Sequence, residues 1–244
     1  MLFLLFVLIN IFSSVNCDKL ITLTNNNFVS LRGPVTGISV ANTIQILLTI
    51  TDNVRYIYLN TNGGSVDAGM KLINVIKNLE VQEIEINCIA DTAISMGFVI
   101  FQSCNKRYVT RYATLMQHQM SMQGISGKIY DINSYVVFTN AMEQELNIMQ
   151  AEKIGMPINE FTGKITSDWW LTSKQAVVNG VADAVANIKC LVDNISETVT
   201  ISHMFGDIIL TYMKCPQIAT PIQVSFDGNF TTELKDEIIN NLFI

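Results

Sequence analysis

The chain has little of what several classes of protein require. Its 244 residues include only two histidines and no Cys-x-x-Cys pair, so neither a metal nor another cofactor is expected. Four prolines and thirteen glycines exclude collagen-like and low-complexity chains. Charged residues make up 15%, without a basic run, and the net charge is -6, so we expect neither nucleic acid nor an anionic membrane as a partner. The apolar fraction of 49% is enough for a sizeable buried core.

Residues 1–17 are predicted to be a signal peptide. A continuous apolar run over residues 2–9 is followed by small and polar residues, with a cleavage site expected after Cys17. The run is shorter than the ~20 residues that a membrane span needs. The alternative is an uncleaved membrane anchor. We therefore predict a protein that is secreted or lies in the lumen of the secretory pathway, free of the membrane after cleavage.

Two glycosylation sequons agree with a secretory route, at Asn194 and at Asn229. Removal of Cys17 with the signal peptide leaves four cysteines, an even number that suits an oxidising compartment. For Cys88 and Cys104 the alternative is a pair of buried free thiols, and their pairing stays open at this point.

Apolar patterning predicts alternating strands and helices. Strands are expected at residues 20–23, 28–31, 54–59, 81–90 and 108–116, and helices at 39–50, 68–79, 95–103, 134–153 and 172–179. This order favours parallel crossovers and an α/β layered fold. Residues 191–244 form a C-terminal extension of unknown role, with strands expected at 198–201, 208–213 and 222–226 and a helix at 232–242.

Four polar or glycine-rich positions follow predicted strands, where α/β sheets gather their active sites. Ser95 opens a helix whose dipole favours developing negative charge, as an acyl-transfer nucleophile requires; an ordinary N-cap is the alternative. His118 is either a general base or a packed histidine, and Asp168 is either a site residue or a turn residue. The pair Gly63-Gly64 either brings backbone amides close to a bound group or forms a simple turn.

Together these segments resemble the proteolytic subunit of the Clp protease. Residues 58–70 resemble its strand and glycine turn, 93–97 its nucleophile segment, 116–119 its histidine strand and 168–176 its aspartate segment. The order Ser, His, Asp differs from that of chymotrypsin, subtilisin and the α/β-hydrolases. The resemblance runs from about residue 20 to residue 188 and implies a Clp/crotonase-like α/β fold for residues 18–190.

The resemblance also implies roles for particular residues. Ser95 would be the nucleophile, His118 the general base and Asp168 its orienting partner. The backbone N–H groups of Gly64 and Met96 would form the oxyanion hole. An extended peptide would pair with the backbone on both sides of the site like an added strand. The residues that would contact it are Gly63, Ser65, Val66, Met120, Ser121 and Met122.

Members of this family form homo-oligomeric rings of roughly seven subunits, so the resemblance implies that residues 134–153 lie at a contact between rings. The chain departs from the family in two places: Met120 stands where a proline usually follows His-Gln, and Ser167 replaces an arginine associated with ring stacking. After signal removal the chain is expected to begin near the first strand, without the segment that meets an ATP-driven unfoldase. Such a partner is therefore not expected.

The predicted function is that of a serine-type endopeptidase that cuts short or unfolded polypeptides through a Ser-His-Asp triad without ATP. One alternative is a catalytically idle Clp-like subunit with a structural or binding role. Another is an esterase that acts on small acyl compounds. Three cooperating residues in the family order favour an enzyme.

A disulfide between Cys190 and Cys215 is predicted to tie the extension to the main domain. Cys190 closes the last segment that resembles the family, and Cys215 lies beside Pro216 in a turn. Both sequons lie on the same appended segment, which suggests that it is luminal and exposed. The alternatives are two unpaired cysteines, or a pairing in which Cys104 takes one partner.

Overall fold

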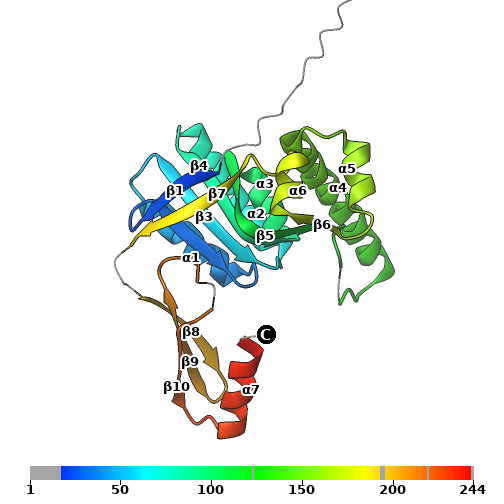
Figure 1. Cartoon of the computed structure of the whole chain (residues 1–244). Helices are drawn as coiled ribbons and strands as arrows, with labels where there is room; N and C mark the ends of the chain where they lie inside the picture. The colour runs from blue at the N-terminus through cyan, green and yellow to red at the C-terminus, as the bar shows by residue number, and fades with distance from the viewer. Residues whose placement is uncertain (1–17, 123, 193–195, 219, 243–244) are drawn as a thin grey trace, which may run out of the picture.

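The computed structural model describes residues 18–122, 124–192, 196–218 and 220–242 (Figure 1). The predicted signal peptide and Asn194 lie outside these residues. Asn229 lies within them and is exposed. Among the residues described, no helix is both long and apolar enough to cross a membrane.

A mostly parallel sheet forms the main domain, with strand order β1-β7-β5-β4-β3-β2. A short strand, β6, pairs with β5 in the antiparallel direction. The parallel pairings and the helices between successive strands confirm the expected α/β layered fold. The strands are β1 (Lys19–Thr24), β2 (Phe28–Arg32), β3 (Val54–Thr61), β4 (Glu85–Ile94), β5 (Lys106–Gln117), β6 (Trp169–Thr172) and β7 (Ala184–Leu191).

The helices of this domain are α1 (Gly37–Thr49), α2 (Val66–Val81), α3 (Met96–Ser103), α4 (Ile129–Ile154), α5 (Ile158–Lys164) and α6 (Ser173–Val178). One predicted boundary is wrong: Val81 ends α2, and the following strand begins only at Glu85. A turn separates the two elements, with Glu83 at a φ of 62°. Three elements were not predicted: β6, α5 and β7. The first two are too short for a clear periodic signal. The third, β7, has eight residues, of which only Ala186 is buried, so it lacks the apolar run of a central strand.

Two apolar clusters hold the sheet in place. The larger one packs α1, α2 and α3 against the strands and includes the fully buried Leu47, Leu72 and Phe98. A smaller cluster joins β1 to the central strands through side chains such as Tyr58 and Ile89. Since side chains alternate along a strand, β3 and β4 contribute to both clusters. The central strands are therefore fixed, and the loops at their carboxyl ends rest on a rigid base.

The C-terminal extension forms a small module with its own core. An antiparallel meander of β8 (Ser196–His203), β9 (Gly206–Met213) and β10 (Gln223–Gly228) packs against α7 (Thr232–Leu242). Ile208, Leu210 and Phe230 are its buried centre. The helix has the predicted bounds, and the strands are longer than predicted. Figure 1 shows the module projecting away from the main sheet.

Two main links join this module to the main domain, beside a hydrogen bond of 3.3 Å from Gln217 Nε2 to the carbonyl of Ile188. Arg32, at the end of β2, donates from Nη1 to Glu197 over 2.6 Å and from Nη2 to the carbonyl of Met213 over 2.9 Å. Burial lowers the pKa of the Arg32 guanidinium, and the nearby charge of Glu197 opposes that shift. The second link is the pair Cys190–Cys215, whose Cα atoms lie 5.9 Å apart, which fits the predicted disulfide.

The other two cysteines also meet. The Cα atoms of Cys88 on β4 and Cys104 at the end of α3 lie 5.7 Å apart, a distance that fits a second disulfide. Both side chains are fully buried. The alternative of two free thiols is therefore not what the structure contains, and neither is a pairing of Cys104 with Cys190 or Cys215.

We expect the double substitution Cys190→Ser/Cys215→Ser to loosen the C-terminal module selectively. The disulfide closes a loop with a sequence separation of 25. In the chain-entropy estimate such a loop is worth about 3 kcal/mol, a large amount for a module with a small core. Limited proteolysis should then cleave residues 196–242 faster while leaving the main domain intact. The neighbouring Lys214→Ser serves as the control, and equal cleavage rates in all three proteins would contradict the prediction.

Candidate active site

Ser95 lies on a sharp turn between β4 and α3. Its φ of 56° and ψ of -119° are a backbone conformation that residues other than glycine rarely adopt. Strained backbone of this kind is found mainly at functional sites. A backbone hydrogen bond of 2.9 Å from the Ser95 N–H to the carbonyl of Met116 holds the turn against β5. The Ser95 side chain makes no capping bond to α3. The alternative of an ordinary N-cap is therefore wrong, and the hydroxyl is free for another partner.

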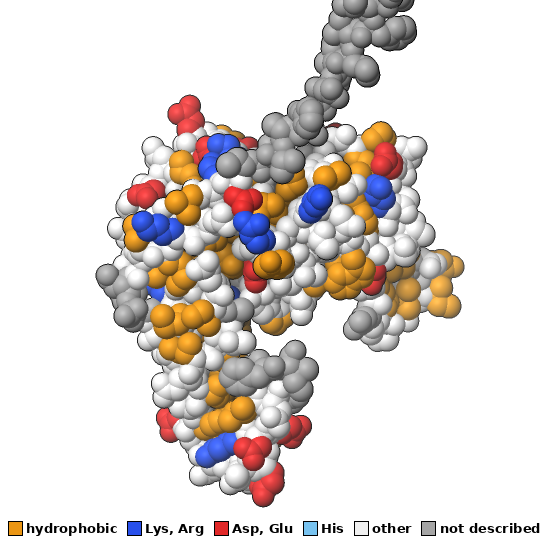
Figure 2. Space-filling model, in the orientation of Figure 1, with side chains coloured by type: hydrophobic (Ala, Val, Ile, Leu, Met, Phe, Trp, Pro, Cys, Tyr) orange, Lys and Arg blue, Asp and Glu red, His pale blue; other side chains and the backbone are white. Residues whose placement is uncertain are grey.

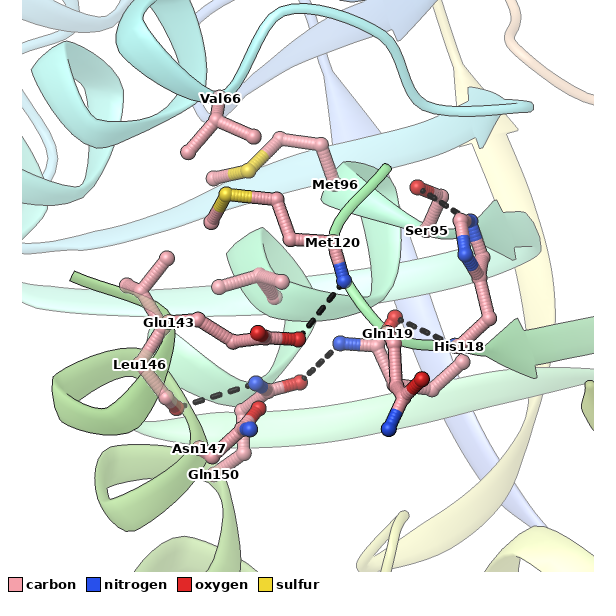
Figure 3. Close-up of a pocket in the computed structure, with 12 residues that line it drawn as sticks. Val66, Ser95, Met96, His118, Gln119, Met120, Glu143, Leu146, Asn147 and Gln150 are labelled. Atoms are coloured by element: carbon pink, nitrogen blue, oxygen red, sulfur yellow. Dashed lines mark hydrogen bonds between the residues drawn. The ribbon is translucent and has the colours of Figure 1, made fainter. Parts of the chain in front are cut away.

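That partner is His118. Its Nε2 lies 2.9 Å from the Oγ of Ser95, within hydrogen-bond distance (Figure 3). The backbone N–H of His118 donates to the side-chain oxygen of Gln117 over 3.2 Å, and Gln117 in turn donates to Gln150 of α4 over 2.6 Å. Both glutamines are almost completely buried. This chain of bonds fixes the end of β5 against α4 and so fixes the start of the histidine segment.

Asp168 lies beside this pair but makes no bond to it. The β5–β6 register pairs Gln117 with Trp169, and one further step places Asp168 opposite His118. Residues opposite each other in an antiparallel pair have neighbouring side chains. Asp168 is exposed, and within the described ranges its carboxylate has neither a hydrogen bond nor an ion pair. The structure thus brings Ser95 and His118 together and shows no bond between them and the third predicted residue.

The glycine pair lies directly against the turn that holds Ser95. A Cβ on Gly63, whose φ is +88°, would come within 2.8 Å of the Ser95 Cβ and 2.9 Å of the Met96 nitrogen. A Cβ on Gly64 would meet the carbonyl oxygen of Val35 at 2.5 Å. Backbone bonds of 2.8 Å from Val35 to Gly63 and from Ser65 to Val35 fix this loop. Only glycine therefore fits at either position.

Two backbone donors near Ser95 remain unused. In the part of the chain that the structure describes, neither the N–H of Gly64 nor that of Met96 donates to an acceptor. The N–H of Met96 is the first of α3, where the helix dipole adds positive potential. Two unpaired donors beside a nucleophilic hydroxyl are what an anionic oxygen needs.

A small cavity of about 40 Å³ opens beside the Ser95–His118 pair (Figure 3). Its residues come from the start of α2, the turn at Ser95, the end of β5 and the inner side of α4. They are Val66, Ser95, Met96, Val99, Gln117, His118, Gln119, Met120, Glu143, Leu146, Asn147 and Gln150. The α4 residues were not anticipated. Their helix was predicted, but nothing in the sequence tells which of its turns faces the site.

Of the six residues expected to contact a peptide, Val66 and Met120 line this cavity, whereas Gly63, Ser65, Ser121 and Met122 are not among its lining residues. Ser65 caps α2 by accepting a bond of 3.2 Å from the N–H of Ala68. The N–H of Met120 donates to Oε1 of Glu143 over 2.8 Å and is therefore not free for a substrate. Ser121 and Met122 follow in an exposed stretch.

The fold and the site together define the class: an α/β protein with a serine–histidine pair at the carboxyl ends of parallel strands. The family model of the Clp protease matches residues 13–189, well over half of the chain. The chain therefore belongs to the Clp protease family, whose members are serine peptidases.

Individual relatives agree with this assignment. The chain is 32% identical to an ATP-dependent Clp protease proteolytic subunit 2 of Nocardia farcinica over 145 residues, covering 57% of this chain and 70% of that protein. For the subunit 2 of Rhodococcus jostii the identity is 31%, covering 58% and 73%. For an ATP-dependent Clp protease proteolytic subunit of Streptococcus salivarius it is 31%, covering 67% and 86%.

Proposed function

We propose that the chain is a serine-type endopeptidase that hydrolyses peptide bonds in short or unfolded polypeptides through Ser95, His118 and Asp168. The observation that carries the proposal is the 2.9 Å contact between Ser95 Oγ and His118 Nε2 at a strained turn. A nucleophile within hydrogen-bond reach of a base is the arrangement that acyl transfer requires.

In the first step, Ser95 Oγ attacks the carbonyl carbon of the scissile peptide bond while its proton passes to Nε2 of His118. The negative charge that develops on the carbonyl oxygen is stabilised by the unpaired N–H groups of Gly64 and Met96. His118 then gives its proton to the leaving amine, which departs and leaves an acyl-enzyme. His118 then takes a proton from a water molecule, whose oxygen attacks the acyl carbon. The bond from that carbon to Ser95 Oγ breaks, the acid leaves, and His118 returns the proton to Oγ.

Asp168 orients His118 in this proposal. A carboxylate that accepts from Nδ1–H keeps Nε2 unprotonated and facing the serine, and it stabilises the imidazolium that forms. The continued β5–β6 register supports this role because it sets Asp168 opposite His118. The Asp168 side chain is exposed and bonds to no other described residue, so its carboxylate is available for this bond.

The substrate lies extended across the site. Gly63, Ser65 and Val66 flank it on one side and Met120, Ser121 and Met122 on the other, with the cavity beside Ser95 receiving one side chain. We propose that the protein hydrolyses its substrates in the secretory pathway or outside the cell, where no ATP-driven unfoldase delivers them. The exposed sequon at Asn229 supports that location.

We propose that the protein works as a homo-oligomeric ring. Helix α4 carries exposed apolar side chains on its first half: Ile129, Tyr130, Tyr135, Val137 and Phe138, exposed by 51% to 86%. Figure 2 shows hydrophobic side chains gathered at this end of the molecule. Contiguous exposed apolar surface of this kind marks an interaction site.

We expect Val137→Asp/Phe138→Asp to shift the protein to a smaller assembly, because charges would lie in the apolar contact. Light scattering at micromolar concentration measures the mass. The matched control is Val81→Asp, at an apolar residue that is 85% exposed at the end of α2. A monomeric wild-type protein, or an unchanged mass in the α4 variant, would overturn the ring proposal.

The function is tested with matched peptide and ester substrates in the absence of ATP. We expect hydrolysis of unstructured peptides at a rate that added ATP does not change, with no hydrolysis by Ser95→Ala. Cleavage of esters alone would favour the esterase, and no cleavage of either substrate would favour the idle subunit.

A further inference from the structure

The cavity beside Ser95 is lined by apolar side chains and by several polar ones, of which one is a carboxylate. Val66, Met96 and Met120 supply aliphatic and thioether groups at one end, and Figure 3 shows both methionine side chains pointing toward Val66. From α4, Glu143 and Asn147 supply a carboxylate and an amide. No lysine or arginine is among the lining residues, so the carboxylate has no fixed cationic partner in the cavity.

Glu143 is held in place by a backbone hydrogen bond. Its Oε1 accepts from the backbone N–H of Met120, at 2.8 Å. The bond requires a residue with an N–H at position 120, which a proline would not provide. The bond fixes the carboxylate at the wall of the cavity and joins the segment after His118 to α4.

Glu143 and Asn147 have further hydrogen-bonding groups that are not in use. Oε2 of Glu143 and the side chain of Asn147 bond to no residue that the structure describes. By contrast, Gln117 and Gln150 are engaged with each other and with backbone groups. On α4 the free acceptors in the cavity therefore belong to one carboxylate and one amide, while the amide of Gln119, which also bonds to no described residue, is exposed.

We propose that Glu143 is a specificity-determining residue that selects a lysine, or a similarly long cationic side chain, on the amino side of the scissile bond. This inference rests on the proposed peptidase function. The residue on that side enters the cavity because Ser95, His118 and Met96, which handle its carbonyl, line it. Its ammonium group donates to Glu143 Oε2 and to the oxygen of Asn147.

The chemistry of the lining residues favours lysine over an aromatic residue. A thin, unbranched stem can lie against the methionines, whose side chains adapt easily, and its ammonium group supplies the donor that a phenyl ring lacks. An acidic residue at the same place is repelled by Glu143. A leucine contacts the apolar lining residues but leaves the Glu143 carboxylate and the Asn147 amide without the partner that a cation provides.

The test compares peptides that differ only in this residue: lysine, glutamine, leucine, phenylalanine or glutamate. For the wild-type protein we expect kcat/KM for lysine to exceed that for leucine by about 10- to 100-fold. Glu143→Gln keeps an oxygen that can accept from Met120 N–H but removes the charge, so the lysine-to-leucine ratio should fall by about 10-fold. Glu145→Gln, an exposed carboxylate on the same helix outside the cavity, should leave the ratio unchanged.

A second arm measures equilibrium binding of the same peptides to Ser95→Ala, with and without Glu143→Gln, so that the result does not depend on turnover. Preferential binding of the lysine peptide that Glu143→Gln abolishes supports the inference, even where the wild-type protein hydrolyses nothing and the proposed function fails. A preference for leucine or phenylalanine that Glu143→Gln leaves unchanged overturns the inference, while hydrolysis by the wild-type protein keeps the peptidase function.

Discussion

Ser95→Ala and His118→Ala should each lower kcat for a peptide substrate by at least about 10³-fold. The double variant should be no slower than the slower of the two single variants. The reason is the shared proton: Ser95 Oγ and His118 Nε2 lie 2.9 Å apart and act as one unit. Once the hydroxyl is gone, the base has nothing to activate. Single-turnover kinetics with a chromogenic peptide measures the effect.

Asp168→Asn extends the same series. The amide cannot hold His118 in the required tautomer, so we expect a loss of orders of magnitude here too, although smaller than for Ser95. Additive losses in Ser95→Ala/His118→Ala would show that the two side chains act separately. Full activity of Asp168→Asn would remove that residue from the triad.

Gly63→Ala should lower kcat/KM by about 100-fold, the size expected when reacting groups are displaced by roughly 1 Å. The added Cβ would lie 2.6 Å from the carbonyl oxygen of Ile94 and 2.8 Å from the Cβ of Ser95, so the turn that presents the hydroxyl must shift. The positive φ of +88° adds strain. Steady-state kinetics and thermal unfolding of the same samples separate misplacement from loss of folded protein.

Gly155→Ala is the matched control for this change. Gly155 also has a positive φ, +78°, but a Cβ there would meet nothing within 4 Å. The Gly155→Ala variant has the same kind of backbone strain but no close contact at its added Cβ, so its activity should stay near that of the wild-type protein. Equal losses in both variants would mean that general destabilisation, not displacement of Ser95, accounts for the Gly63 effect.

The elements with strong periodic patterns could be predicted from the sequence, and the short or shared ones could not. The helix at residues 232–242 matches α7, whereas β6 has only four residues and forms because β5 offers it an edge. Val81 looked like the start of a strand because it is β-branched. In the structure it continues the helical turn before it. Its side chain is 85% exposed, so the continuing backbone of α2 and not packing of the side chain places it in the helix, against its β propensity.

The residues of the candidate site could likewise be predicted only in part. Ser95, His118 and the glycine pair follow strands, so their meeting at one edge of the sheet follows from a parallel fold. Glu143, Asn147 and Gln150 reach the site through the rotation of α4 about its axis. That rotation depends on contacts between distant segments, such as the bond between Gln117 and Gln150, which no local pattern in the sequence encodes.

Labelling with a fluorophosphonate probe, followed by peptide mapping, tests the central claim most directly, because only an activated serine reacts with the probe. We expect a single labelled site at Ser95 in the wild-type protein, strongly reduced labelling in His118→Ala and none in Ser95→Ala. Absence of labelling in the wild-type protein, or labelling at another serine that persists in Ser95→Ala, would contradict the account.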